Sequence, residues 1–399
     1  MDNRLAAIRA WLRRTLPDER FDVFPASQDA SFRRYFRVSP VRDDRDRKGT
    51  RESPGAFFQE PGDKGAPPGP TNTPPGNRQG PIDLTGEGRQ GNLPPAAPMA
   101  GEMAHGSFIV MDAPPTHEDS SEFVFVAHLL REAGANVPEV LATDFEQGFL
   151  LLSDLGTTHY LKELDENRSD KDRVDGLYGD AMEALLSIQT RAARDGLPAY
   201  DHERLEEEMA LFRDWFLVRH LKIPLTTAIE RTLRESFDFL QRAAAEQPRV
   251  FVHRDYHSRN LMVRERNNPG ILDFQDAVHG PITYDLVSLL KDVYIAWPRA
   301  RVQDWALGYR ERALREGLLA HVDATAWLRW FDLMGAQRHL KIAGIFSRLY
   351  HRDGKPGYLA DIPLTLDYLA EVCAHYPELA ALGGLLDTLV YPPLPKGRR

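Results

Sequence analysis

Short apolar runs separated by small polar turns occupy the first part of the chain and have the composition of strands, rich in Val, Phe, Ile and Leu. These runs are residues 21–24, 32–38, 108–112, 140–144 and 148–152. Between the third and fourth runs, apolar positions recur every three or four residues from 122 to 133, which predicts an amphipathic helix closed by Gly134. The pattern predicts a small lobe of antiparallel strands with one helix.

After Thr157 the apolar positions follow a helical period. The predicted helices are residues 180–189, 205–220, 229–245, 285–297, 302–316 and 326–350. One stretch interrupts them, because residues 250–276 consist of short apolar runs joined by polar turns. The expected fold class is therefore α+β, with a small antiparallel-sheet lobe followed by a larger helical lobe.

Residues 40–106 differ in composition from the rest of the chain. They contain 12 of its 29 prolines and 12 of its 29 glycines, with few large apolar residues. Such a segment buries too little surface to offset the entropy lost on ordering, so we expect a disordered insertion. Without it, the strands at 32–38 and 108–112 become neighbours in one hairpin. The expected lobes are residues 1–39 with 107–153, and residues 154–399.

Charge and composition narrow the range of partners. The formal net charge is −9, whereas nucleic-acid-binding proteins usually carry a basic excess. The single cysteine, Cys373, excludes an internal disulfide. The amphipathic N-terminus lacks the apolar core of a secretory signal, and no apolar run approaches the ~20 residues of a membrane span. We therefore expect a cytoplasmic protein that binds neither nucleic acid nor membrane and needs no obligatory protein partner.

The interrupting stretch carries the candidate chemistry. Asp255 follows its first apolar run, Asn260 comes five residues later, and Asp273 follows its last run. Two short strands joined by a turn would bring these side chains together. A carboxylate that accepts a hydroxyl proton, with an amide and a second carboxylate that hold Mg²⁺, is the arrangement of phosphoryl transfer. A second His-Arg-Asp tripeptide, residues 351–353, lacks the asparagine, and we expect it to be structural.

These motifs resemble a known superfamily. Residues 253–261 (HRDYHSRNL) and 271–276 (ILDFQD) are similar to those of the aminoglycoside phosphotransferases and choline kinases, whose fold is similar to that of protein kinases. Residues 29–35 (DASFRRY), 110–115 (VMDAPP) and 281–286 (PITYDL) resemble more closely the anomeric N-acetylmuramate/N-acetylglucosamine kinases of bacterial cell-wall recycling. The resemblance covers nearly the whole chain except residues 40–106 and implies a two-lobed, protein-kinase-like fold.

The resemblance also implies roles for individual residues. Asp255 matches the catalytic aspartate, and Asn260 and Asp273 match the ligands of Mg²⁺, which would be bound together with the co-substrate ATP. Structural support is expected from two residues, His253 in the loop and Asp285 at a helix start. The residues expected at the nucleotide are Ser31 in the first turn and Ser153, Asp154 and Leu155 between the lobes.

One element of the kinase pattern is missing. Kinases place a lysine on the third strand to bind phosphate, but Met111 stands at that position, and residues 108–112 contain no lysine. We consider two readings of Arg34, which shares a strand face with Phe36 and Val38. In the first reading, the guanidinium of Arg34 takes the place of the lysine at the nucleotide. In the second, Arg34 is a solvated strand residue.

The acceptor implied by the resemblance is a small amino sugar, phosphorylated on its anomeric hydroxyl. The residues that we expect to contact it are His257, Arg259, Gln275, Asp276 and Arg338, the last through a lactyl carboxylate. Two alternatives stay open. One is another small-molecule acceptor, such as choline, homoserine or an aminoglycoside. The other is a weakly active nucleotide-binding module, suggested by the missing lysine.

Overall fold

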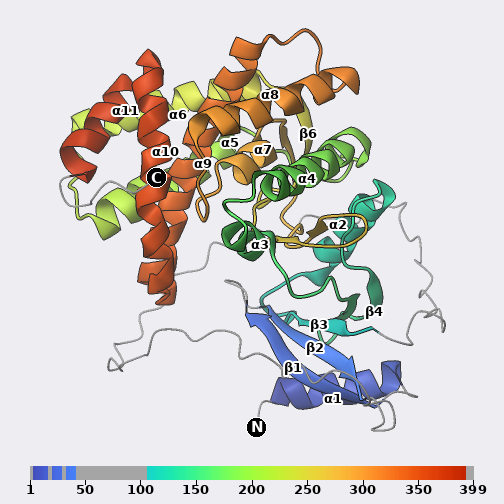
Figure 1. Cartoon of the computed structure of the whole chain (residues 1–399). Coiled ribbons are helices and arrows are strands. Elements are labelled where there is room, and N and C mark those ends of the chain that lie inside the picture. Colours follow the sequence, from blue (N-terminus) through green and yellow to red (C-terminus); the bar gives the residue numbers. More distant parts are fainter. Residues whose placement is uncertain (1–2, 17–19, 29–32, 42–105, 392–399) are drawn as a thin grey trace.

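The computed structural model describes residues 3–16, 20–28, 33–41 and 106–391. They form two lobes, one built on a five-stranded sheet and one mainly helical (Figure 1). The sheet lobe contains α1 (Asn3–Thr15), β1 (Phe21–Gln28), β2 (Arg34–Pro40), β3 (Phe108–Asp112), α2 (Ser120–Glu132), β4 (Val140–Asp144) and β5 (Phe149–Ser153). The helical lobe contains α3 (Tyr160–Glu166), α4 (Lys171–Arg191), α5 (His202–Leu211), η2 (Phe212–His220), α6 (Thr227–Ala245), β6 (Arg249–Val252), β7 (Leu261–Met262), β8 (Gly270–Ile271), β9 (Val278–Pro281), α7 (Tyr284–Leu290), α8 (Arg299–Arg315), α9 (Ala324–Asp353), η3 (Pro356–Asp361), α10 (Ile362–His375), η4 (Pro377–Leu379), α11 (Ala380–Leu385) and η5 (Leu386–Val390).

All neighbouring strands of the large sheet are antiparallel, in the order β1-β2-β3-β5-β4. β2 pairs with β3 so that Val38 lies opposite Phe108 and Arg34 lies opposite Asp112. The predicted pairing of these two strands is therefore confirmed. The predicted disorder of the insertion concerns mainly residues 42–105, which lie outside the described residues.

The two faces of the sheet belong to different apolar cores, because successive side chains of a strand point to opposite sides. Val110 and Phe149 face α1, where they pack with Ile8 and other apolar residues of that helix. Met111 and Leu150 face the other way, into the core that the sheet shares with α2 and the helical lobe. The amphipathic N-terminal segment is thus a helix packed on the small lobe.

Helix α2 connects the sheet to the helical lobe (Figure 1). The side chain of Asp119 caps its first turn. After its end, Gly134 has a φ of 82°, a left-handed conformation that glycine adopts without strain. On its inner side, the ring of Phe123 lies 4.8 Å from that of Phe274. The helix therefore packs directly on the residue that follows Asp273.

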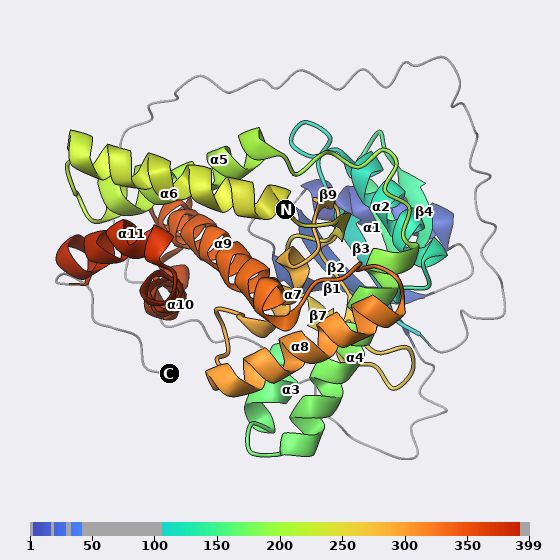
Figure 2. The ribbon, with the colours of Figure 1, turned by 90° about the horizontal axis from the view of Figure 1, so that it is seen from above.

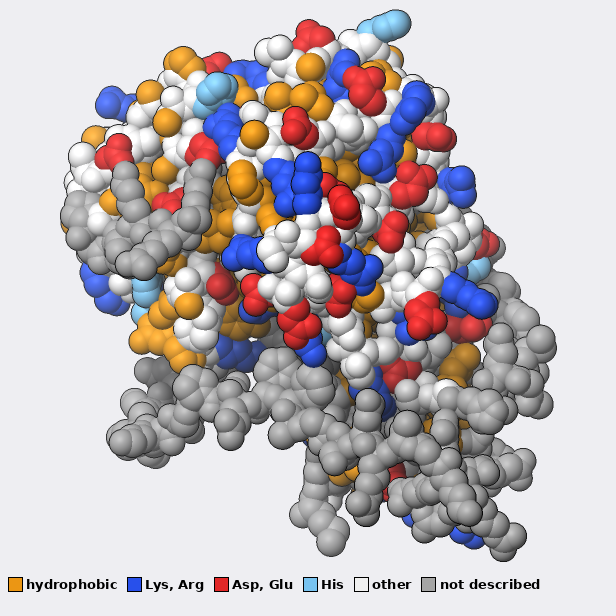
Figure 3. All heavy atoms as spheres, in the orientation of Figure 1, with side chains coloured by type: hydrophobic (Ala, Val, Ile, Leu, Met, Phe, Trp, Pro, Cys, Tyr) orange, Lys and Arg blue, Asp and Glu red, His pale blue; other side chains and the backbone are white. Residues whose placement is uncertain are grey.

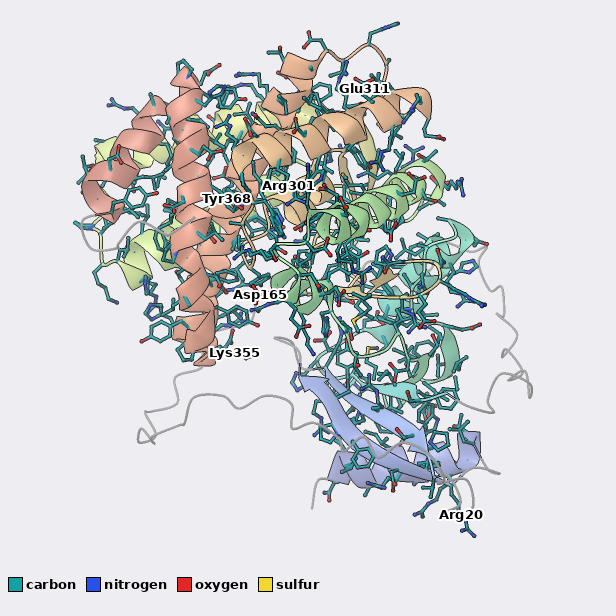
Figure 4. The ribbon with its side chains drawn as sticks, in the orientation of Figure 1. Arg20, Asp165, Arg301, Glu311, Lys355 and Tyr368 are labelled. Atoms are coloured by element: carbon teal, nitrogen blue, oxygen red, sulfur yellow. The ribbon has the colours of Figure 1, made fainter. Side chains whose placement is uncertain are left out.

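The long helix α9 forms the centre of the helical lobe. Figure 2 shows it between α5 and α6 on one side and α10 and α11 on the other. Gly344 allows the closest approach, since a Cβ there would lie 2.3 Å from the backbone carbonyl carbon of Leu211 in α5. On the side of α10, Tyr368 (labelled in Figure 4) stacks on His339 of α9 with ring centroids 4.9 Å apart. Helix α9 is therefore buried for most of its length.

The stretch with the polar motif forms two small antiparallel sheets, β6 with β9 and β7 with β8. Strands predicted around residues 250, 261 and 271 are confirmed, whereas β9 was not predicted. The helix predicted from 285 to 297 is shorter, since α7 ends at Leu290. The reason is Asp292, whose carboxylate accepts hydrogen bonds from the backbone N–H groups of Ser258 and Tyr294, both at 3.0 Å. These bonds turn the chain toward the loop after β6.

Charges of both signs are mixed on the surface. On the face drawn in Figure 3, Lys and Arg side chains alternate with Asp and Glu over the helical lobe. In the part of the chain that the structure describes, no helix combines the length and the apolar character needed to cross a membrane.

Candidate active site

The loop between β6 and β7 has an unusual backbone conformation. Arg254 has a φ of 78° and Asp273, after β8, a φ of 63°, both in the left-handed region that residues with a Cβ rarely adopt. The buried Asp285 accepts hydrogen bonds from the backbone N–H of His253 at 2.6 Å and of Arg254 at 2.9 Å. Burial raises the pKa of Asp285 to about 7, although both donors favour the charged carboxylate. Asp285 thus holds the loop at its strained residue.

Asp255 lies in this loop with its side chain 39% exposed. Its backbone N–H donates to Nδ1 of His253 at 3.2 Å, and burial lowers the pKa of His253 to about 4, so that this imidazole is neutral. Partial burial would raise the pKa of Asp255, but the nearby positive charges, led by Lys341, lower it to about 2. Asp255 is therefore ionised at neutral pH and can accept a proton from a hydroxyl group.

Asn260 and Asp273 meet beside Asp255. Nδ2 of Asn260 donates to the backbone oxygen of Asp255 at 3.0 Å and to Oδ2 of Asp273 at 3.2 Å. The amide oxygen of Asn260 and the Asp273 carboxylate are hard oxygen donors, which fit Mg²⁺. Among the described residues, no three His, Cys, Asp or Glu side chains form a metal cluster. An ion here would therefore depend on the amide and on oxygen ligands from a nucleotide or water.

Two of the residues expected to bind an acceptor lie directly after Asp273. Gln275 is buried, and its Nε2 donates to Oδ1 of Asp273 at 2.8 Å. Gln275 therefore orients the Asp273 carboxylate. The sequence predicts that Gln275 contacts the acceptor, but it does not predict this hydrogen bond. Asp276 is exposed, and its backbone oxygen accepts a hydrogen bond from Arg254.

The other expected acceptor residues lie around Asp255. The backbone N–H of His257 donates to the backbone oxygen of Asp255 at 3.0 Å, and its buried Nδ1 has no hydrogen-bond partner among the described residues. Arg338 of α9 is buried, donates to Oγ of Ser288 at 2.6 Å, and lies 3.9 Å from Oδ1 of Asp255. Arg259 is exposed and rests on the ring of Tyr294 at 3.7 Å. The structure thus brings His257 and Arg338 to Asp255.

A buried network of ion pairs adjoins Asp255. Glu208 of α5 lies 3.0 Å from Nζ of Lys341, pairs with Arg254, and accepts a hydrogen bond from the hydroxyl of Tyr200. Burial would raise the pKa of Glu208, but Lys341 and Arg254 lower it to about 2. The network therefore fixes the arginine that precedes Asp255.

Sequence reasoning missed Glu208, for a physical reason. It is the last of three successive glutamates on one helix, and only its burial against α9 distinguishes it from the other two. A helical period places every third or fourth residue on the buried side, and Glu208 shares that side with Leu205 and Met209. A charged residue on the apolar face of this helix was the signal by which Glu208 could have been found in the sequence.

The segment expected to contact adenine, residues 153–155, joins the lobes. The Asp154 carboxylate accepts hydrogen bonds from Arg37 and Ser107, both at 2.6 Å, and from the backbone of Gly156 at 2.9 Å. Burial would raise the pKa of Asp154, but these donors lower it. The Asp154 side chain thus ties β2 to this segment.

The structure places Arg34 beside Asp112, on the side of the sheet that α1 covers. Its Nε and Nη2 donate to Oδ2 of Asp112 at 3.0 and 2.6 Å, and Arg4 of α1 pairs with the other oxygen of that carboxylate. Arg34 does share its face with the apolar residues of β2, but that face is covered by α1 and is opposite to the one that packs on α2. This pairing with a buried carboxylate argues against the phosphate contact expected of Arg34. Ser31 lies outside the described residues.

A sheet lobe and a helical lobe, with an ionised aspartate beside an amide–carboxylate pair, define a kinase-like phosphotransferase. The chain belongs to the phosphotransferase enzyme family, whose model matches residues 101–331. Among solved structures, a choline kinase from Cryptosporidium parvum superposes with a TM-score of 0.51 at 11% identity, covering 96% of each chain. An aminoglycoside phosphotransferase has a TM-score of 0.50 at 12% identity, covering 92% of this chain and 98% of that one. These two likenesses concern the fold alone.

Curated relatives share more sequence identity with this chain than these two solved structures do. A protein of Pseudomonas aeruginosa named N-acetylmuramate/N-acetylglucosamine kinase is 49% identical over 283 residues, which are 71% of this chain and 82% of the relative. A relative of the same name from Neisseria meningitidis is 36% identical over 389 residues, which are 97% of this chain and 96% of the relative. The second match extends over both lobes.

Proposed function

We propose that the enzyme transfers the γ-phosphate of ATP to the anomeric hydroxyl of N-acetylmuramate or N-acetylglucosamine, a reaction of peptidoglycan recycling. The observation that carries the proposal is the ionised Asp255 beside Asn260 and Asp273, in a chain matched over 97% of its length by a relative named for these sugars. The proposed partners are the sugar and ATP, with no obligatory protein partner. The reaction consumes ATP, so we place the enzyme in the cytoplasm.

In this proposal the nucleotide binds between the N-terminal lobe (1–39 and 107–153) and the C-terminal lobe (154–399), with adenine against the backbone of residues 153–155. Asn260 and Asp273 would hold Mg²⁺, which neutralises charge on the phosphates when bound. Asp255 orients the sugar hydroxyl and takes its proton as the bond to phosphorus forms.

The charges around Asp255 favour an anionic acceptor over a cationic one. The charges of Lys341, Arg338 and Arg254 act on Asp255, and among the described residues Glu208 pairs with Lys341 and Arg254. A carboxylate such as the lactyl group of N-acetylmuramate would pair with Arg338, whereas choline and aminoglycosides carry positive charge and would be repelled. His257, with its unpaired Nδ1, would contact the sugar.

The proposal is tested by ADP release from MgATP with a panel of free sugars, choline, homoserine and aminoglycosides. We expect turnover with N-acetylmuramate and N-acetylglucosamine and none with their methyl glycosides, in which the anomeric oxygen is blocked. Turnover of a methyl glycoside at the rate of the parent sugar would exclude anomeric transfer. Mg²⁺-dependent ATP binding without turnover on any acceptor would instead support a nucleotide-binding module.

A further inference from the structure

The position of the usual phosphate-binding lysine is closed in this protein. Met111 of β3 is fully buried, lies opposite Tyr35 and Leu150 in the sheet, and belongs to the apolar core beneath α2. A charged side chain there would have to enter this core. A cation for the triphosphate would therefore have to come from another position.

Arg33, one residue before β2, approaches the catalytic face. Its guanidinium forms an ion pair with Glu118 at 2.7 Å, and the two side chains are only 10% and 13% exposed. Glu118 lies in the segment between β3 and α2. The pair therefore joins a cation of the sheet to a carboxylate beside the helix, which is the relation that lysine and glutamate have in kinases.

The charges near Arg33 extend to the proposed metal site. Burial would lower the pKa of Arg33, but the net shift is upward, owing to Tyr35, Glu118, Asp276 and Asp273. Strand alternation places Arg33 on the face of Tyr35, which lies opposite Met111 and packs on the core that contains Phe274, the residue after Asp273. The guanidinium thus lies on the side where a metal-bound triphosphate would sit. A guanidinium can also donate to Glu118 and to phosphate oxygens at the same time, because it carries five N–H groups in one plane.

We propose that Arg33, oriented by Glu118, binds the β- and γ-phosphates of ATP and takes the place of the strand lysine. This inference rests on the proposed use of ATP but not on the identity of the acceptor. The opposite reading is that Arg33 only attaches the segment before α2 to the sheet. If Arg33 binds the phosphates, its loss weakens binding of the triphosphate but not of adenosine. If it only attaches this segment, its loss does not affect the triphosphate selectively.

The test is calorimetric binding of a non-hydrolysable ATP analogue with Mg²⁺, and of adenosine, to the full chain. We expect Arg33→Ala to weaken the triphosphate about ten- to a hundredfold, the usual effect of losing a charge-assisted hydrogen bond, and to change adenosine affinity less than about twofold. Arg33→Lys should recover part of the loss. Glu118→Gln should weaken the triphosphate several-fold and leave adenosine unaffected.

Arg34→Ala is the matched control, since the neighbouring arginine binds Asp112 on the α1 face. It should lower the melting temperature and leave triphosphate affinity unchanged. An equal loss of adenosine and triphosphate affinity in Arg33→Ala, or no loss, would overturn the proposal; if that variant does not fold, the same comparison applies to Arg33→Lys and Glu118→Gln. Acceptor is absent throughout, so these results are independent of whether the sugar assignment is correct.

Discussion

Asp255 is the residue on which the proposed chemistry depends most directly. Asp255→Asn keeps the backbone N–H that donates to His253 and removes only the proton-accepting charge. We expect kcat with N-acetylmuramate to fall about 10²- to 10⁴-fold, the usual contribution of a positioned general base, with little change in the KM for ATP. Steady-state ADP release measures both. Asp353→Asn, in the second His-Arg-Asp tripeptide at the end of α9, is the matched control and should leave kcat unchanged.

Glu208 should make stability depend on pH. Its pKa in the folded protein is about 2, below the ordinary value of 4.5, so its ion pairs stabilise the fold above pH 4.5 and are lost as the pH falls toward 2. Glu208→Gln should cost roughly 3 kcal/mol at pH 6, because it leaves Lys341 and Arg254 buried without their partner. Urea unfolding should show this difference shrinking below pH 4.5.

A surface pair provides the comparison for Glu208. Glu163 pairs with Arg173 at 2.7 Å, and that arginine side chain is 43% exposed. Glu163→Gln should cost less than about 1 kcal/mol. If Glu208→Gln destabilised the protein equally at pH 6 and pH 3, the ionised network would not be the source of the stability.

At the scale of the elements, the contact of α9 with α5 depends on one missing side chain. In Gly344→Ala the new Cβ would lie 2.3 Å from the carbonyl carbon and 2.6 Å from the oxygen of Leu211, so the helices must separate. We expect a loss of about 1 to 3 kcal/mol, the usual cost of overpacking, measured by thermal and urea unfolding. Gly308→Ala in α8 meets no atom within 4 Å and should instead stabilise the fold by up to about 1 kcal/mol. Equal effects of the two substitutions would contradict the close approach.

The elements also show what the sequence could predict. Strands β2, β3 and β4 and most helices follow from local periodicity, and the spacing of Asp255, Asn260 and Asp273 required a strand, a turn and a strand. The choice between Arg33 and Arg34 could not be made in this way. It depends on which face α1 covers, and that contact joins residues more than a hundred positions apart, such as Arg4 and Asp112.

At the scale of the whole molecule, the two strands that flank the insertion lie side by side. Val38 of β2 faces Phe108 of β3, and the backbone N–H of Val41 donates to the oxygen of Arg20 at 2.7 Å. A connection of a few residues can therefore span the gap between these strands. Apolar cores cover both faces of the sheet, one of them shared with the helical lobe, and both are formed by described residues outside the range 42–105.

We therefore expect that replacing residues 42–105 by about eight Gly and Ser residues leaves kcat/KM within about twofold. The free energy of unfolding should rise by up to about 2 kcal/mol, because each halving of a flexible connection saves about 0.6 kcal/mol of closure entropy. A Gly/Ser segment of the original length is the control for composition. Loss of turnover in both replacements, with folding intact, would mean that these residues contribute to the site; loss only in the short one would mean that the lobe needs the longer connection.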